Sequence, residues 1–256
     1  MKQLSIILFT LISALFAAPQ FSWQVVESLA HPPERFTQGL FWHQNELWEC
    51  TGISGKSAIY RSDAKGKLLA QKSIAAPHFG EGCVVHNGAL FVLTWQSRVG
   101  FIYDLNSLNQ IGNFPINGEG WGLTQKDGYL WMTNGSAYLY QMDPANMQVK
   151  DSVLVKDGEE AVLNLNELDN TPWGIAANVW YKDSIAFIDE KSGKVQGWLD
   201  LRELRSRSCG AGSRCDVLNG VAWDGKHLWV TGKFWPKMWV LKLSTGLPKS
   251  SGTPKR

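Results

Sequence analysis

The chain lacks the features that identify most nucleic-acid-binding proteins and several enzyme classes. Its 25 Lys and Arg residues and 23 Asp and Glu residues leave a net charge of +2, which is too balanced for a protein that must neutralise many phosphates. It contains no glycine-rich phosphate loop and no GxSxG elbow, so the common nucleotide-binding and serine-hydrolase motifs are absent. With 44% hydrophobic and 19% charged residues in 256, disorder and coiled coil are also excluded, and one globular domain is expected.

Metal-binding patterns are missing as well. The five His residues form no paired-ligand motif, and the four Cys residues lack the CxxC spacing of zinc sites. The sequence therefore predicts neither a bound metal nor a cofactor.

Long hydrophobic runs are confined to the N-terminus. Lys2 precedes an apolar run from Leu4 to Phe16, and two small residues follow it before Pro19. This order is typical of a signal peptide, so we expect cleavage of residues 1–18 and export to the periplasm or outside the cell. Because the run is short for a bilayer span and no later stretch is long and apolar enough, we expect no membrane association after cleavage; an uncleaved anchor is the alternative.

All four cysteines lie in the mature part, and an oxidising compartment permits disulfides. Cys209 and Cys215 flank the flexible sequence GAGSR, and we expect them to pair. Cys50 and Cys83 lie in strand-like surroundings. Four cysteines allow three pairings, so the sequence leaves Cys50 and Cys83 open as a second disulfide or as buried free thiols.

A repeat organises the mature chain. Five times, a short segment, usually ending in Gly and an apolar residue, is followed by a turn and a second strand, most often aromatic. The aligned positions 39, 82, 122, 167 and 220 are 43, 40, 45 and 53 residues apart, close to the roughly 40 to 50 residues of a propeller blade. The segments are FTQGL at 36–40, FGEGC at 79–83, EGWGL at 119–123, LNEL at 165–168 and LNGV at 218–221.

The repeat predicts an all-β, five-bladed β-propeller spanning residues 19–245, followed by a polar tail at 246–256. Residues 21–29 alternate as a strand, while the fifth repeat ends early. The N-terminal strand is therefore expected to complete the last blade and close the ring. The long fifth interval contains an insertion at 203–215, and the single candidate helical turn lies at 201–205.

The first strand of each propeller blade lines the central channel, so equivalent residues of these strands should converge at one mouth. The residues that precede the repeat positions are Gln38, Glu81, Trp121 and Asn166. Glu81 is the single carboxylate of this set and lies between two glycines, which makes it the acid–base candidate. Nearby aromatic rings would exclude water from the Glu81 carboxylate, and this desolvation would raise its pKa.

Other candidate site residues have less specific surroundings. The 13 Trp residues exceed what an ordinary core requires, and a flat aromatic slot is expected from Phe36, Phe79, Trp95, Trp121 and Trp180. Glu49, in an otherwise aromatic strand, is counted with the substrate-binding candidates, although its position is equally consistent with a supporting hydrogen bond and with a role in chemistry. Lys233 ends the second strand of the fifth repeat beside two large aromatic residues, where a solvated loop position is the plain alternative.

Nine short motifs follow one another along the chain: FTQGL (36–40), WECTG (48–52), FGEG (79–82), LTWQ (93–96), EGWG (119–122), LNEL (165–168), ANVW (177–180), LNG (218–220) and TGKFWP (231–236). Each motif is weak alone, but their order makes the set specific. In these motifs the chain resembles the plant-type glutaminyl cyclases and their bacterial relatives, which are five-bladed propeller glutaminyl-peptide cyclotransferases. The resemblance covers about residues 24–243.

The resemblance implies a metal-free reaction on peptides or proteins with an N-terminal Gln. The α-amine attacks the γ-carboxamide of its own Gln, and ammonia leaves to give pyroglutamate. By this analogy Glu81 shuttles the proton, Gln38 and Asn166 hydrogen-bond the substrate, and Lys233 supplies positive charge near the oxyanion or keeps Glu81 ionised. The chain departs from the family pattern at Cys50, where Ser is expected, and in the 203–215 insertion.

Two other functions remain. A non-catalytic propeller that binds peptide or sugar would need the same aromatic slot. A metal-dependent, lactonase-like propeller would need several inner carboxylates or His residues, whereas Gln38, Trp121 and Asn166 occupy those places. The sequence shows no apolar surface strip that would argue for an oligomer, so a monomer is expected, and nucleic acid is not an expected partner.

Overall fold

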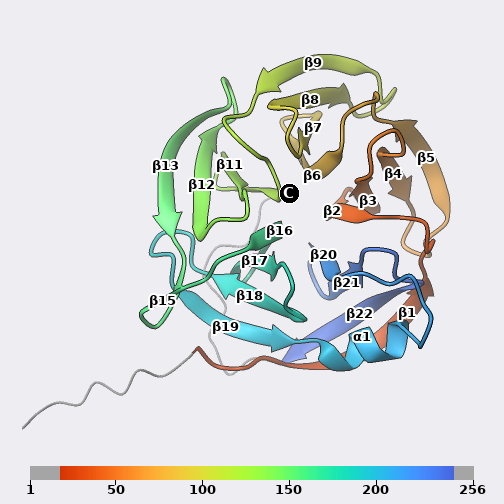
Figure 1. Ribbon diagram of the computed structural model, residues 1–256, viewed down its shortest axis with the longest axis vertical. Coiled ribbons are helices and arrows are strands. Elements are labelled where there is room, and N and C mark those ends of the chain that lie inside the picture. The colour runs from red at the N-terminus through yellow and green to blue at the C-terminus, as the bar shows by residue number, and fades with distance from the viewer. Residues whose placement is uncertain (1–17, 245–256) are drawn as a thin grey trace, which may run out of the picture.

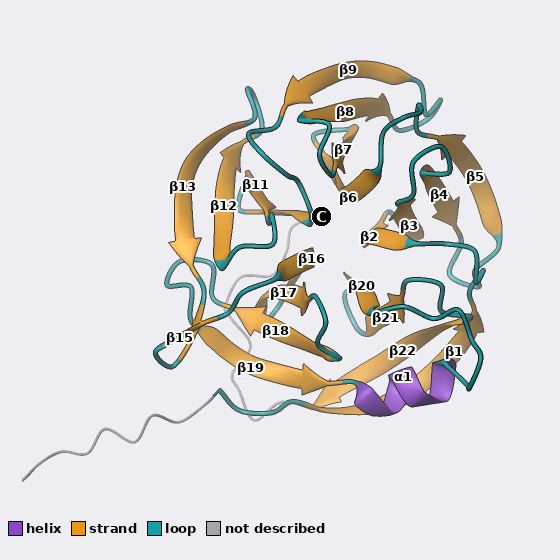
Figure 2. Ribbon diagram, in the orientation of Figure 1, coloured by secondary structure: helices purple, strands orange, loops and turns teal. Residues whose placement is uncertain are grey.

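The computed structural model describes residues 18–244 of the chain. Within them, five four-stranded antiparallel sheets are arranged as blades around a common axis (Figure 1). Figure 2 shows that nearly all of this ring is strand and turn. The predicted all-β, five-bladed propeller is therefore confirmed. The predicted signal peptide (except Ala18) and polar tail lie outside the described residues.

Each of the first four blades runs from an inner to an outer strand in chain order. Blade one contains β2 (Thr37–His43), β3 (Glu46–Thr51), β4 (Ala58–Ser62) and β5 (Leu68–Ser73). Blade two contains β6 (Gly80–His86), β7 (Ala89–Thr94), β8 (Val99–Asp104) and β9 (Gln110–Pro115). Blade three contains β10 (Leu123–Lys126), β11 (Tyr129–Met132), β12 (Tyr138–Asp143) and β13 (Gln148–Leu154). Blade four contains β16 (Leu165–Thr171), β17 (Gly174–Val179), β18 (Ser184–Ile188) and β19 (Val195–Asp200).

The last blade joins the two ends of the described chain. It contains β20 (Leu218–Trp223), β21 (Leu228–Gly232), β22 (Lys237–Ser244) and, as its outer strand, β1 (Ser22–Ala30). β1 pairs antiparallel with β22, from Ser22 opposite Ser244 to Ala30 opposite Lys237. This confirms the predicted closure by the N-terminal strand, which covers an edge that would otherwise be open.

The inner strands explain the glycines of the repeat. A Cβ on Gly82 would lie 2.6 Å from the backbone of Leu123, and one on Gly122 would lie 2.0 Å from the carbonyl oxygen of Asn166. Neighbouring inner strands therefore approach too closely at these two points for any side chain. The third repeat differs from the prediction, because β10 begins only at Leu123 and the preceding residues 119–122 form a loop.

The insertions and cysteines add local structure to this ring. The helix α1 (Arg202–Ser208) lies in the fifth-blade insertion, and a hairpin of β14 (Lys156–Asp157) and β15 (Glu160–Ala161), which the sequence did not indicate, lies between blades three and four. Cys209 and Cys215 form the predicted disulfide. Cys50 and Cys83, left open by the sequence, form a second one, which ties β3 of blade one to β6 of blade two. Among the described residues, no helix is long and apolar enough to span a bilayer.

Candidate active site

A cavity of about 250 Å³ lies at the end of the ring where the inner strands begin. Inner strands supply Gln38, Glu81 and Asn166, and connecting segments supply most of the aromatic rings. Nine of the ten functional side chains predicted from the sequence line this one cavity. They are Phe36, Gln38, Phe79, Glu81, Trp95, Trp121, Asn166, Trp180 and Lys233.

Glu81 is the carboxylate in the lining of this cavity, and only 4% of the residue is exposed. Its Oε1 accepts a hydrogen bond of 3.0 Å from Nε2 of Gln38, on the neighbouring blade. Burial raises the pKa of Glu81 well above its usual value, the positive charge of Lys233 lowers it, and the negative charge of Glu119 raises it. Such a carboxyl group can exchange protons closer to neutral pH than an exposed one.

Lys233 brings positive charge to the same cavity. It is 5% exposed, and its Nζ lies 4.6 Å from the centre of the Phe36 ring. Burial lowers the pKa of Lys233, whereas the charges of Glu81 and Asp216 raise it. The alternative of a solvated loop lysine does not fit this position.

The aromatic walls hold one another through edge-to-face contacts. The ring of Phe79 meets Phe36 at 5.9 Å and Trp95 at 5.6 Å between centroids. Trp121 and Trp180 form a second wall, where their rings meet at 5.3 Å with perpendicular planes. These contacts restrict the rings and form a slot with apolar faces.

Glu119 joins two of these walls, a role that sequence reasoning missed. Its Oε2 accepts hydrogen bonds from the indole Nε1 atoms of Trp95 (2.8 Å) and Trp121 (2.9 Å), and its Oε1 accepts one from Gln96 (2.9 Å). Burial would raise the pKa of Glu119, but the three hydrogen bonds lower it overall. The sequence signal was its place two residues before a cavity tryptophan in the EGWG motif.

One buried amide, Asn166, lines the cavity, and a second, Asn219, contacts a residue of the lining. Asn166 is 3% exposed, and its Oδ1 has no hydrogen-bond partner among the described residues, so the cavity contains an unused acceptor. Asn219 was not predicted as a site residue, although it precedes Gly220 just as Glu81 precedes Gly82. Its Nδ2 donates to the carbonyl oxygen of Thr37 at 2.9 Å and to Oε1 of Gln38 at 3.0 Å.

Glu49 is the predicted substrate-binding residue that the structure does not bring into the cavity. Its carboxylate accepts hydrogen bonds from His31 (3.0 Å), Arg35 (2.7 Å) and Thr37 (2.7 Å). Burial opposes its ionisation, but the charges of His31 and Arg35 and these hydrogen bonds lower the pKa of Glu49 to about 2. Because protein groups already occupy this carboxylate, Glu49 has the supporting hydrogen-bond role and does not belong to the substrate-binding residues.

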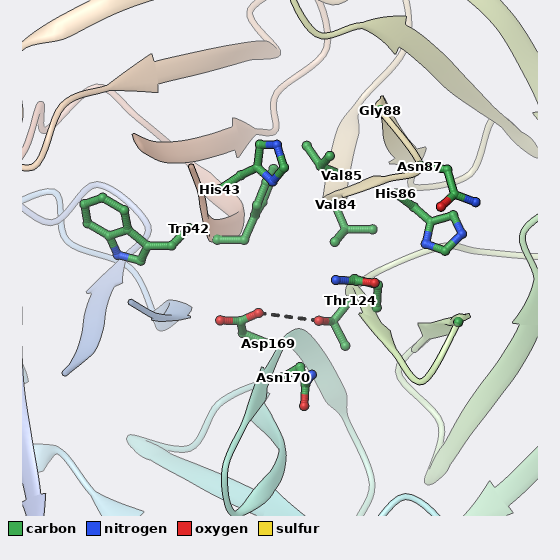
Figure 3. A pocket seen from close by; sticks show the side chains of 13 residues that line it. Trp42, His43, Val84, Val85, His86, Asn87, Gly88, Thr124, Asp169 and Asn170 are labelled. Atoms are coloured by element: carbon green, nitrogen blue, oxygen red, sulfur yellow. Dashed lines mark hydrogen bonds between the residues drawn. The ribbon is translucent and has the colours of Figure 1, made fainter. Parts of the chain in front are cut away.

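A second cavity, of about 330 Å³, lies at the other end of the ring. Figure 3 shows His43, Val85, His86, Thr124 and Asp169 around it, on the inner strands β2, β6, β10 and β16. The Asp169 carboxylate accepts hydrogen bonds from the backbone N–H of Trp223 and from the Thr124 hydroxyl. The sequence predicted no site here. Among residues 18–244, no group of three or more His, Cys, Asp or Glu side chains could hold a metal ion.

Comparison with known proteins identifies the family of the chain. The sequence profile described as glutamine cyclotransferase matches residues 5–243. A glutaminyl-peptide cyclotransferase of Arabidopsis thaliana is 39% identical over 233 residues, which cover 89% of this chain and 73% of the relative. The crystal structure of Myxococcus xanthus glutaminyl cyclase superposes with a TM-score of 0.81 at 26% identity, covering 89% of this chain and 98% of that one. The chain therefore belongs to the glutamine cyclotransferase family.

Proposed function

We propose that this protein is a glutaminyl-peptide cyclotransferase, which converts the N-terminal Gln of peptides or proteins to pyroglutamate and releases ammonia. We further propose that the reaction needs no metal ion and that Glu81 carries the proton. The observation that carries the proposal is the cavity itself. A buried carboxyl group with a raised pKa, an unused amide acceptor and a lysine line one aromatic slot.

The aromatic slot would position the substrate. A Gln side chain must fold back so that its own α-amine reaches the carboxamide carbon Cδ, and the flat faces of Phe36 and Trp121 restrict it to such conformations. Asn166 Oδ1 can accept a hydrogen bond from an N–H of the substrate. Because the bound substrate already holds the α-amine and the carboxamide together, less conformational entropy is lost on reaching the transition state.

Glu81 would move one proton during the reaction. The α-nitrogen forms a bond to the carboxamide carbon Cδ, and the carbonyl oxygen becomes an oxyanion near the positive charge of Lys233. Glu81 Oε2 takes a proton from the attacking nitrogen and gives it to the amide nitrogen Nε2 of the substrate. The carbon–nitrogen bond to that group then breaks, the carbonyl re-forms, and ammonia leaves beside the pyroglutamyl ring.

Export and a monomeric state are part of the same proposal. The two disulfides fit an oxidising compartment, which supports the signal-peptide interpretation of the N-terminus. The net charge of the chain, +2, is too balanced for a nucleic-acid-binding protein. Size-exclusion chromatography with light scattering, and N-terminal sequencing of the secreted chain, test both points.

The first experiment is ammonia release from a short Gln-initiated peptide by the purified mature protein, with and without a strong chelator, beside Glu81→Gln. Release that resists the chelator and is lost in the variant supports the proposal. Release that the chelator abolishes would contradict the metal-free mechanism. Binding of Gln-initiated peptides without any ammonia release would favour a non-catalytic binding propeller instead.

A further inference from the structure

Three buried side chains from three blades form a directed hydrogen-bond chain that ends at Glu81. Asn219 on β20 donates from Nδ2 to Oε1 of Gln38 on β2, at 3.0 Å. Gln38 donates from Nε2 to Oε1 of Glu81 on β6, also at 3.0 Å. All three residues are at most 4% exposed, so water does not readily replace these partners.

The direction of this chain is set by a backbone group. The same Nδ2 of Asn219 donates to the carbonyl oxygen of Thr37 at 2.9 Å, and a carbonyl oxygen can only accept. Asn219 must therefore present its NH2 group at this point. Because Gln38 receives a donor from Asn219, its oxygen faces Asn219 and its own NH2 group faces Glu81.

We propose that Asn219 is a positioning residue of the active site, which holds the Gln38 amide with its donor end toward Glu81. Asn219 is not part of the cavity lining and therefore acts through Gln38. A donor at Oε1 favours the ionised carboxylate, and it leaves Oε2 to carry the proton. This inference rests on the proposed function of Glu81 as the proton shuttle.

The other groups around Glu81 do not determine this direction. Lys233, after β21, favours the ionised form of Glu81, and Glu119, before β10, opposes it. The negative charge of Asp216 raises the pKa of Lys233. On β16, Asn166 is neutral, and the Glu167 carboxylate is occupied by the backbone N–H groups of Leu40 and Val221. Of the described residues, only Gln38 donates a hydrogen bond to Glu81.

The decisive variant is Asn219→Asp, which keeps the shape of the side chain but removes the donor. The Gln38 amide should then turn over, with its NH2 toward residue 219 and its oxygen toward Glu81, which must be protonated to donate. We expect the acidic limb of the kcat/KM profile to move up by about one pH unit, and kcat at pH 7 to fall about tenfold. KM should change less than about twofold, because residue 219 does not touch the cavity.

Asn178→Asp is the matched control for the added charge. Asn178 is also fully buried, and its Oδ1 accepts a hydrogen bond of 2.9 Å from the backbone N–H of Gly220, the residue after Asn219. Aspartate keeps that acceptor and adds the same charge beside the same strand, without contacting Gln38. We expect an unchanged acidic limb. An equal shift in both variants would show that buried charge is the cause and would overturn the proposal.

A second variant, Asn219→Leu, removes the donor without adding charge and also covers the case in which Asn219→Asp does not fold. We expect lower kcat with retained KM, because the Gln38 amide is no longer held in one orientation. Glu81→Gln separates the two proposals. If it is inactive while folded Asn219 variants keep the wild-type pH profile and kcat, the positioning role is overturned and the proposed function stands. If Glu81→Gln is active, the proton shuttle itself is wrong.

Discussion

Two buried glutamates in neighbouring blades have opposite electrostatic surroundings. Glu49 on β3 is held by His31, Arg35 and Thr37, and its pKa falls to about 2. Glu81 on β6 has one neutral amide donor and aromatic neighbours, and its pKa rises well above the usual value. Burial alone does not make a carboxylate reactive. What distinguishes Glu81 is that no cation among residues 18–244 forms an ion pair with it and that it lines a cavity.

The two ends of the ring show the same contrast at a larger scale. Both are built from the same inner strands. At the end shown in Figure 3, Asp169 is engaged by Trp223 and Thr124. At the other end, Glu81 Oε2 and Asn166 Oδ1 have no hydrogen-bond partner within the described chain, and aromatic rings limit access of water. At the first cavity these polar groups remain for a ligand to satisfy.

The largest expected effect is on catalysis at Glu81. Glu81→Gln should lower kcat about 100-fold or more, because the positioned proton carrier is lost. Substrate binding, measured by calorimetry with a Gln-initiated peptide, should change little. The variant should also be at least as stable as the wild type, because a carboxyl group that is costly to ionise has been removed. Turnover close to that of the wild type would place the chemistry elsewhere.

Glu49→Gln should instead affect stability. Removing this charge leaves the buried His31 and the partly buried Arg35 without their anionic partner, which should cost about 3 kcal/mol of unfolding free energy. The measurement is urea denaturation at pH 7. The folded variant should keep most of its kcat, because Glu49 does not line the cavity. A loss of activity as large as that of Glu81→Gln at full stability would erase the contrast between the two residues.

The pH dependence of stability should separate them further. The pKa of Glu49 falls from an unfolded value near 4.5 to about 2 in the folded protein, so its stabilising contribution is present above pH 4.5. That contribution should be lost as the pH falls from about 4.5 through about 2. Thermal melts of the wild type should show this loss, and Glu49→Gln should show less of it. Identical profiles would mean that the ion pairs do not stabilise the folded state.

The smallest expected effect is on substrate binding when Glu119 is changed. Glu119→Gln leaves one acceptor oxygen for three donors, so the indoles of Trp95 and Trp121 should be held less firmly. We expect KM to rise about threefold. Because the Glu119 charge raises the pKa of Glu81, the acidic limb of kcat/KM should move slightly downward. Gln96→Ala, which removes one donor and leaves both indole contacts, is the control. An unchanged KM in Glu119→Gln would show that the two rings are held by their packing alone.

Most of the cavity residues could be predicted because equivalent positions in the repeats of a propeller lie at equivalent places around its axis. Gln38, Glu81 and Asn166 occupy equivalent positions in their repeats. Once one of them is placed on an inner strand, the repeat places the other two on inner strands as well. Asn219 follows the same rule, and the sequence analysis overlooked it. Glu49 was assigned to the substrate because its strand neighbours are aromatic, and the sequence does not reveal which long-range partners a buried carboxylate acquires. Glu119 was missed for the same reason, since its bonds to Trp95 and Gln96 cross between two segments.

By itself, the sequence determined the all-β class, the five blades, their closure by the N-terminal strand and the convergence of equivalent residues from four blades on a single mouth. These follow from local periodicity and from a repeat length that any alignment of the chain with itself exposes. Only the tertiary structure decided the Cys50–Cys83 pairing, the ion pairs of Glu49 and the direction of the Gln38 amide. The last depends on a hydrogen bond between residues 181 positions apart, and such a bond exists only when the ring has closed and brought those blades into contact.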